Sequence, residues 1–391
     1  MATYDDFADK LIDKLGDTKL GKNLGPLIDQ LKKMAEAVRE IDTAMTSLYK
    51  VTDETNARYT RFLTDTLQNA KNLGRTISDL IEQTANWAKL GFSLNQAEEL
   101  AKASSIYANI SGVDDDTAIN NLAAAMKEFH IEAADSIKIV DKLSNLGKTY
   151  STSSASFGEA LGVSASALAS AGNSMDESLA LIAALSEITQ DSEEAGNALK
   201  TLGERMKGAD GESAIYSNEL SQLSQQITSF TKTANTPRGI SLFTDNTRKN
   251  YKSAYQLLLD ISQVWNQLSR KNQSEILDTL VGPEYSDALA ELLSNMSQAE
   301  NALSTSLSSS GSALESQERA LDSIEAKTVQ FEAAFQSLSN TMVNSGLFKF
   351  FVDLGTTGVS ALDSLINKIG ALPALGAAIG GTLVYKKVGM A

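Results

Sequence analysis

The stretch Gly91-Phe-Ser-Leu-Asn-Gln-Ala-Glu-Glu-Leu100 shows how this chain builds its fold. Gly91 stands where a preceding helix should end, since glycine tolerates the left-handed conformation that closes a helix. Ser93 and Gln96 have the spacing of a capping box, in which each side chain bonds to the backbone N–H of the other residue at a helix start. The stretch therefore predicts a helix end followed at once by a new helix.

The same signals recur over residues 91–208. Capping-box spacing is found again at Ser156-Phe-Gly-Glu159 and Ser174-Met-Asp-Glu177, and Val113-Asp-Asp-Asp116 places acidic residues where a helix dipole is positive. Further helix ends are expected at three glycines, Gly112, Gly147 and Gly172. Together these signals predict a compact array of roughly six short amphipathic helices.

Residues 1–90 are predicted to form a long helical or coiled-coil segment. Its apolar side chains alternate in steps of three and four, which is the a/d spacing of a coiled-coil seam; they are Leu31, Met34, Val38, Ile41, Met45 and Leu48. Two interpretations remain open: a face for association with another helix, or a helical hairpin packed on itself. If the first holds, charged residues at Met34, Val38 and Ile41 should abolish self-association.

The second half of the chain is predicted to be helical as well. Residues 209–300 form a second helical block with an irregular turn around Thr236-Pro-Arg-Gly239 and a break at Val281-Gly-Pro-Glu284. Residues 301–347 are predicted to be one long polar helix, whose apolar side would consist of Leu314, Leu321, Ile324, Val329 and Phe335. The predicted fold class is therefore all-α, from long N-terminal helices through a compact array to a long helix and an apolar helical hairpin.

Residues 348–391 are apolar and rich in glycine and alanine. Ala371–Tyr385 carries no charged side chain, but a helix that spans a membrane needs about 20 residues. An amphipathic hairpin and the start of a membrane-contacting region are both open interpretations. The sequence stops at Ala391 without a polar tail, which favours a piece of a longer reading frame.

The composition argues against most kinds of catalytic, metal-binding and nucleic-acid-binding site. The chain has no cysteine and one histidine, His130, so thiol catalysis, Cys-type zinc sites and a Ser-His-Asp triad have little to draw on. A net charge of −15 disfavours direct nucleic-acid binding, which depends on Lys and Arg. Trp87 and Trp265 lie on apolar helical faces and are expected in the core. We expect no enzyme activity, cofactor or metal.

Several runs of the sequence resemble a known protein family, and this resemblance indicates a function. The run Ala85–Ala103, followed in order by Asn120–Phe129, Ala133–Leu146 and Ser154–Ala171, resembles the core region of siphophage tail tape measure proteins. Later blocks continue the resemblance, namely Gly172–Ala180, Ala195–Leu202, Tyr251–Trp265, Ile276–Leu293 and Ala320–Lys327.

The resemblance implies an α-helical ruler and assembly scaffold, present in several copies in the lumen of the virion tail. It would be made in the bacterial host cytoplasm, from a phage or a prophage, and would contact the tail tube protein, tail-tip or hub proteins and tail assembly chaperones. It would also aid passage of DNA through the host envelope. The alternatives are a helical pore-forming or membrane-interacting effector and a coiled-coil scaffold, but the heptad pattern lasts for only about three heptads.

Overall fold

The computed structural model describes residues 21–207, 217–244 and 250–344. These residues form sixteen α-helices and one short 3-10 helix, and among them the only β interaction is an isolated bridge between Phe243 and Tyr251. The all-α prediction is confirmed for this part of the chain. The predicted apolar region, 348–391, lies outside the described residues.

The helices follow one another with short connections. The first group is α2 (Gly21–Tyr49), α3 (Asn56–Leu73), α4 (Ile77–Lys89), α5 (Leu94–Ser111), α6 (Asp115–Glu128), α7 (Ser136–Thr149), α8 (Ser154–Ser170), α9 (Met175–Thr189) and α10 (Ser192–Arg205). The second group is α11 (Ser217–Phe230), α12 (Ala254–Trp265), α13 (Arg270–Leu280), α14 (Ser286–Ser294), α15 (Ser297–Leu307), α16 (Ser312–Leu321) and α17 (Ile324–Asn344).

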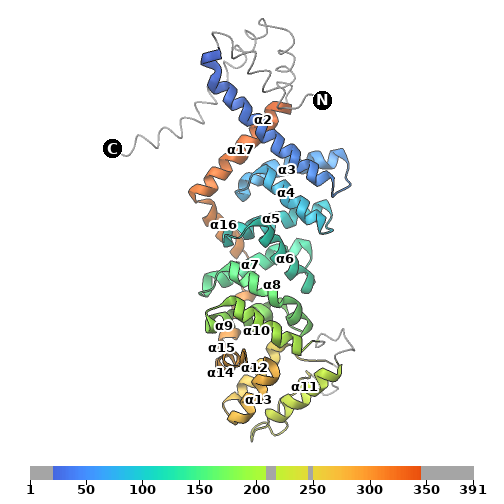
Figure 1. Ribbon diagram of the computed structural model, residues 1–391, viewed down its shortest axis with the longest axis vertical. Helices are drawn as coiled ribbons and strands as arrows, with labels where there is room; N and C mark the ends of the chain where they lie inside the picture. Colours follow the sequence, from blue (N-terminus) through green and yellow to red (C-terminus); the bar gives the residue numbers. More distant parts are fainter. Residues whose placement is uncertain (1–20, 208–216, 245–249, 345–391) are drawn as a thin grey trace, which may run out of the picture.

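The helices stack into a long, narrow column (Figure 1). The chain descends from α2 at one end to α11–α14 at the other, with α6, α8 and α10 stacked on one another. It then turns back. Helix α15 packs on α9 and α7, α16 on α7 and α5, and α17 on α2 and α3. We call this returning segment, residues 297–344, the strap.

Local capping explains most helix boundaries in the column. Ser93 with Gln96, and Ser174 with Glu177, form the predicted capping boxes at the starts of α5 and α9. Asp114 caps α6 by accepting a bond from the backbone N–H of Thr117, as the acidic start predicted. Six α-helices, α5–α10, occupy the stretch where about six were expected.

Two of the predicted signals were wrong. Helix α8 is capped by Ser153, three residues before Ser156. Gly147 does not end a helix but lies inside α7, where the chain folds back closely. A Cβ atom at Gly147 would lie 2.8 Å from the backbone nitrogen of Ser154. The glycine therefore allows the backbones of α7 and the start of α8 to approach each other closely.

The long-helix predictions at both ends also need correction. Within the described part of residues 1–90 the chain forms three helices, with breaks at residues 50–55 and 74–76. The single helix expected over 301–347 is three helices, α15–α17, broken at residues 308–311 and 322–323. Of its expected apolar side, Leu314 is 55% exposed, while Leu321, Val329 and Phe335 are half-buried.

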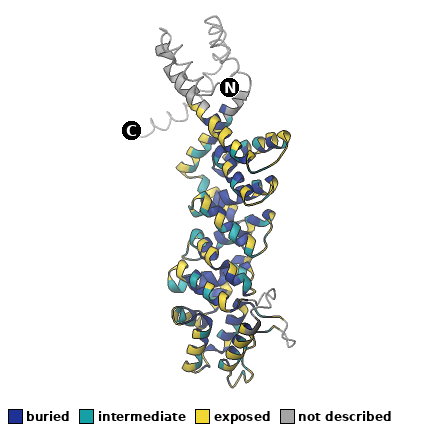
Figure 2. Ribbon diagram, turned by 45° about the vertical axis from the view of Figure 1, so that its right-hand side comes forward, coloured by how far each residue is buried: buried dark blue, intermediate teal, exposed yellow. Residues whose placement is uncertain are grey.

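A single connected core of buried side chains runs along the column, from Ile41 in α2 to Ala333 in α17 (Figure 2). Trp87 and Trp265 are buried in it, as predicted. His130 follows Phe129, the C-cap of α6, in a left-handed conformation with φ of 53°, and it is exposed. No helix within the described ranges is long and apolar enough to cross a membrane.

Helices α8 and α10 approach each other unusually closely because small residues face each other. A Cβ atom added at Gly203 would lie 2.5 Å from the backbone carbon of Ala167, and one at Gly196 would lie 3.1 Å from the carbonyl oxygen of Ala160. The two glycines are seven residues apart, so they lie on the same face of α10. Backbone-to-backbone contact therefore fixes the spacing of these two layers.

Tyr107 joins the layers on the other side of α8. Its hydroxyl donates to the carbonyl oxygen of Ser154 at 3.3 Å and accepts a bond from the amide of Asn121 at 3.3 Å. Gly158 leaves the space that the hydroxyl occupies, because a Cβ atom there would collide with it. Burial raises the pKa of Tyr107 to about 12, so this phenol stays protonated and keeps its donor at ordinary pH.

Candidate interaction site

The predicted association face lies on α2, and the structure covers its described part with the protein's own helices. Val38, Ile41, Met45 and Leu48 are all buried, and α2 packs on α4 and α17. The side chains of Leu31 and Met34 lie outside the described residues. Packing of the seam within one chain accounts for these four residues, and self-association through the face stays a prediction.

This burial changes the experiment that tests self-association. A charge at Val38 or Ile41 would be buried without a partner, which destabilises the monomer itself. We therefore expect Met34→Glu alone to reduce self-association while leaving the circular dichroism spectrum unchanged. Sedimentation velocity measures the effect, with Glu36→Gln, at an exposed position of the same helix, as the control. Sedimentation identical to that of the original protein would rule out the face.

The best-defined interaction surface within the chain lies between α7 and the strap. It begins at the carboxyl end of α15, whose last carbonyl groups lack partners within the helix. Asn145 donates from Nδ2 to the carbonyl oxygen of Thr305 at 2.8 Å, and Lys142 Nζ lies 3.4 Å from that of Ser306. A cation at this end of a helix is also favoured by the helix dipole.

The amino end of α16 is capped by the same helix, α7. Asp141 accepts bonds from the backbone N–H of Ala313 at 2.8 Å and of Gly311 at 3.1 Å. No side chain within α16 supplies this cap, since its N-cap residue is Gly311, with φ of 82°. Side chains on α7 thus bond to both helix ends at the 308–311 break, together with the hydroxyl of Ser308, which donates to the carbonyl oxygen of Ser304 at 2.8 Å. These bonds stabilise the interruption of the predicted long helix.

Two further side chains of α7 hold α16 in place. Ser144 donates to the carbonyl oxygen of Ser312 at 3.1 Å, and its Oγ lies 2.8 Å from that of Ser316. Lys148 forms an ion pair with Glu315 at 3.0 Å. The hydrogen bond and charge of Lys148, together with the charge of Arg319, lower the pKa of Glu315. The carboxylate of Glu315 therefore stays ionised to lower pH than an ordinary glutamate, which preserves its ion pair with Lys148.

Buried amides continue the contact toward α2. Gln317 donates to the carbonyl oxygen of Leu73 at 3.0 Å, which Asn109 also contacts at 2.6 Å. Gln336 on α17 accepts a bond from the backbone N–H of Ile77 at 2.7 Å and donates to Glu40 at 3.0 Å. The strap therefore caps α4 in turn, since Ile77 is the first residue of that helix.

Among the described side chains of the strap beyond α15, the buried ones are polar or small, and Leu321, Val329 and Phe335 are half-buried. The described buried residues are Ser309, Ser312, Ala313, Gln317, Ala333, Gln336 and Ser339. A typical hydrogen bond contributes about 0.5–1.5 kcal/mol net, whereas full burial of a Leu or Ile side chain contributes about 1.5–3 kcal/mol. Helix α9 buries Leu179, Leu181, Ile182 and Leu185. Where its side chains are described, the strap beyond α15 therefore buries less apolar surface per residue than α9 does.

Sequence reasoning did not find this surface. Asp141, Ser144 and Asn145 carry no motif, and their partners lie about 160–170 positions further along the chain. The one available signal is the run Ser308-Ser-Ser-Gly311, whose serines by themselves are typical of a linker or a solvated helix face. A glycine after such a run favours a break, but nothing in the sequence shows which helix completes the caps.

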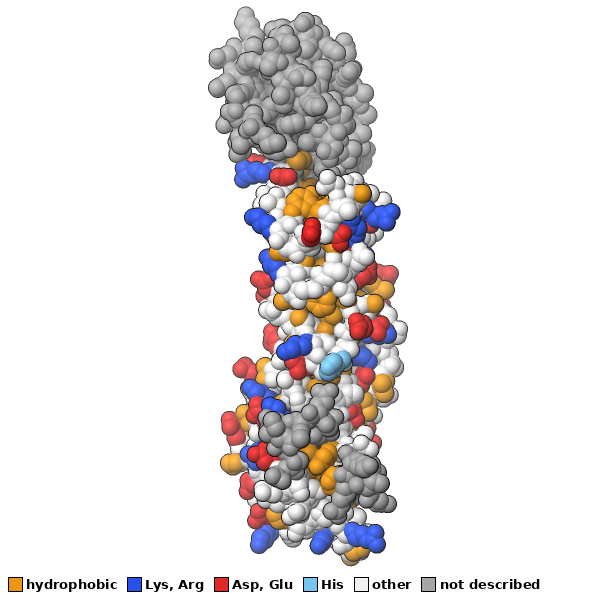
Figure 3. Space-filling model, turned by 90° about the vertical axis from the view of Figure 1, so that its right-hand side faces the viewer, with side chains coloured by type: hydrophobic (Ala, Val, Ile, Leu, Met, Phe, Trp, Pro, Cys, Tyr) orange, Lys and Arg blue, Asp and Glu red, His pale blue; other side chains and the backbone are white. Residues whose placement is uncertain are grey.

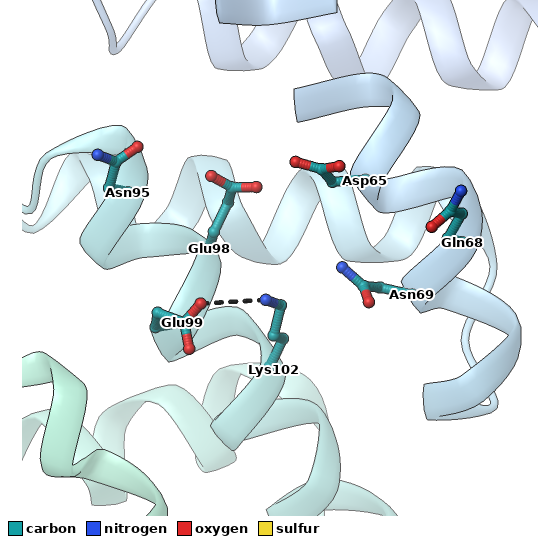
Figure 4. Close-up of a pocket in the computed structure, with 7 residues that line it drawn as sticks. All are labelled: Asp65, Gln68, Asn69, Asn95, Glu98, Glu99 and Lys102. Atoms are coloured by element: carbon teal, nitrogen blue, oxygen red, sulfur yellow. Dashed lines mark hydrogen bonds and ion pairs between the residues drawn. The ribbon is translucent and has the colours of Figure 1, made fainter. Parts of the chain in front are cut away.

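A polar cleft of about 340 Å³ lies between α3 and α5, at the column's upper end (Figure 4). It is lined by Asp65, Gln68, Asn69, Asn95, Glu98, Glu99 and Lys102. Lys102 pairs with Glu99 at 3.0 Å, and Arg58 pairs with Glu98. Pockets for small molecules are mostly apolar with a few polar groups, so an entirely polar lining of this kind is typical of a solvated seam between helices.

The outer surface has a mixed character (Figure 3). Acidic and basic side chains are both scattered along the face drawn there, and hydrophobic side chains form separate small patches between them. Within the described ranges, no three histidine or carboxylate side chains gather into a group that could hold a metal ion.

Comparison with known proteins identifies the family. A family model described as phage-related minor tail protein matches residues 67–282, which run from within α3 to the turn after α13. No solved structure matches the chain. This family model is typical of tape measure proteins, and the match takes in α4 to α13, including α5, α7 and α9, on which α15 and α16 lie. Because it covers more than half of the 391 residues, this chain belongs to the family of phage-related minor tail proteins.

Proposed function

We propose that this chain is the folded core of a tail tape measure protein, a non-catalytic ruler and assembly scaffold in the lumen of the tail tube. Membership of the minor tail protein family carries the proposal. The narrow column of stacked helices supports it (Figure 1), because a component enclosed by a tube must be long and thin. Its partners would be the tail tube protein, tail-tip or hub proteins, assembly chaperones and further copies of itself.

The column itself is a poor measuring rod. An extended helix rises about 1.5 Å per residue, but this chain descends the column and returns along it, as the packing of α17 on α2 shows. The returning helices therefore run back along the descending ones and add no further length to the column. We infer that the column anchors or initiates the ruler, and that helical segments outside it measure the length.

Tail length tests the ruler directly. In-frame deletions in helical segments outside the column, made in the full gene of the phage, should shorten the tail by about 1.5 Å per residue removed. Electron microscopy of the particles measures the length. Replacement of the same segments by helical sequence of equal length is the control and should leave the tail unchanged. Tails of normal length on infectious deletion particles would contradict the proposal.

A further inference from the structure

We propose that two copies of this chain associate through the end of the column that α11–α14 form, with a basic surface of each copy on an acidic surface of the other. Two groups of side chains make up these surfaces: the basic end, Lys232, Arg238, Arg270 and Lys271, and the acidic face, Glu284, Asp287 and Glu291. Association is a property of the chain itself, whereas its use in the tail rests on the function proposed above.

Hydrogen bonds bring the residues of the basic end together. Asn272, in the first turn of α13, donates from Nδ2 to the carbonyl oxygen of Phe230, the last residue of α11, at 2.9 Å. The turn that follows α11 and carries Arg238 is tied to the connection before α13, because Asn235 donates to Gln267 at 3.0 Å. The basic end therefore lies at one tip of the column, where Figure 3 shows basic side chains.

The charges of the basic end have no acidic partner within the described part of the chain. Of the basic residues described in α11–α13 and their connections, only Lys252 forms an ion pair, with Asp260. All four side chains of the basic end are exposed. Glu275 follows Lys271 by one helical turn, yet no ion pair joins the two. The basic end is thus free to meet carboxylates of another molecule.

Two of these charges stand at the unfavourable end of a helix. Arg270 and Lys271 are the first residues of α13, whose first turn contains no acidic side chain. The helix dipole is positive at this end, so it disfavours cations there. Within one chain this arrangement only destabilises α13, whereas carboxylates laid against it by a second molecule would offset both the dipole and the mutual repulsion of the cations.

The acidic face lies on the neighbouring helix α14. Asp287 and Glu291 are one turn apart on that helix, where like charges repel each other, and Glu284 lies in the turn before it. All three are exposed and form no ion pair with a described residue. Burial, together with the charges of Glu284 and Glu194, raises the pKa of Tyr285, so a further carboxylate stands near this face.

Each copy therefore carries both halves of a complementary pair. Helix α14 packs on α13 and α12, so the two surfaces share one end of the column, and a two-fold axis allows both contacts to form at once. Nucleic acid suits the basic end less well. Four cations would contact only about four phosphates, and the net charge of −15 opposes an extended polyanion along the rest of the chain.

Sedimentation velocity of the full chain tests the association. At an ionic strength of about 0.15 M, where charges more than about 8 Å apart are largely screened, the sedimentation coefficient should rise with protein concentration toward that of a dimer. Salt near about 1 M should abolish the rise. Arg270→Glu with Lys271→Glu should raise the dissociation constant about tenfold or more. Because acidic residues suit a helix start, this variant keeps its fold.

The matched control reverses two basic residues far from this end. Arg61 and Lys71 on α3 are exposed and form no ion pair with a described residue. Arg61→Glu with Lys71→Glu changes the net charge by the same amount, so it reproduces the added repulsion between copies. It should weaken the association far less. Measurement in the Met34→Glu background separates this contact from any association through α2.

A charge swap tests the pairing of the two surfaces. Asp287→Lys with Glu291→Lys should abolish self-association as the first reversal does. A mixture of the two reversed proteins should form a one-to-one complex, because each basic surface then meets an acidic one again. Both proteins remain acidic overall, so the net charge alone cannot produce this complex.

Three results would overturn the proposal. They are a chain that stays monomeric at about 0.15 M salt, an association that reversal of Arg270 and Lys271 leaves unchanged, and reversed proteins that stay apart when mixed. Binding of a duplex DNA fragment by a monomeric chain, lost in the same reversal, would assign the basic end to nucleic acid instead. None of these results depends on tail length, so failure of this contact and failure of the ruler are distinguishable.

Discussion

Replacement of Trp87 by alanine is expected to lower the free energy of unfolding by about 3–5 kcal/mol. Trp87 is fully buried at the end of α4. Its ring meets Phe92 edge-to-face at 5.6 Å, and its Nε1 donates to Ser104 at 3.1 Å. Alanine removes the contacts of the largest side chain in this layer and leaves a cavity that two packed helices cannot close.

Urea denaturation followed by circular dichroism measures this loss. Trp87→Phe keeps much of the volume and should cost less than Trp87→Ala, since mainly the hydrogen bond to Ser104 and part of the ring are lost. Leu90→Ala is the control, because Leu90 lies three residues away and is 54% exposed. Its effect should stay within about 0.5 kcal/mol. Equal effects of Trp87→Ala and Leu90→Ala would show that α4 and α5 do not pack as described.

Replacement of Gly203 by alanine is expected to destabilise the protein by about 1–3 kcal/mol, although alanine is the better helix former by about 1 kcal/mol. The new methyl group would lie 2.5 Å from the backbone carbon and 2.6 Å from the carbonyl oxygen of Ala167. The backbone atoms of Ala167 cannot move away from the new methyl group in the way that the end of a flexible side chain can. Helices α8 and α10 must therefore move apart, which loosens two layers of the column.

Gly162→Ala is the matched control for this prediction. Gly162 lies on α8, is exposed, and its nearest neighbour to an added Cβ atom is Asn121 at 3.5 Å, an ordinary contact. The substitution should be neutral or should stabilise the protein by up to about 1 kcal/mol through helix propensity. Denaturation midpoints of the two variants measure the difference. A Gly203→Ala protein as stable as the Gly162→Ala protein would contradict the close packing of α8 and α10.

The sequence by itself determined the helices and many of their starts. Ser93, Asp114 and Ser174 cap the helices that they were expected to cap, because a cap depends on residues only two or three positions apart. The apolar side chains of α12 recur every three or four residues, the spacing of one helix face, and they are all buried: Tyr255, Leu258, Ile261 and Trp265. Caps and apolar periodicity depend on residues within one or two helical turns of one another, so they can be predicted without knowledge of the tertiary structure.

Only the tertiary structure decided how the helices cover one another. The seam of α2 is buried by α4 and α17, although its heptad spacing suits a second chain equally well. The break at 308–311 depends on Asp141 and Asn145, far earlier in the chain, and the role of Gly203 depends on the backbone of Ala167. These contacts join positions that no local pattern links. Which of several suitable surfaces a helix covers is settled by the free energy of the whole packed column.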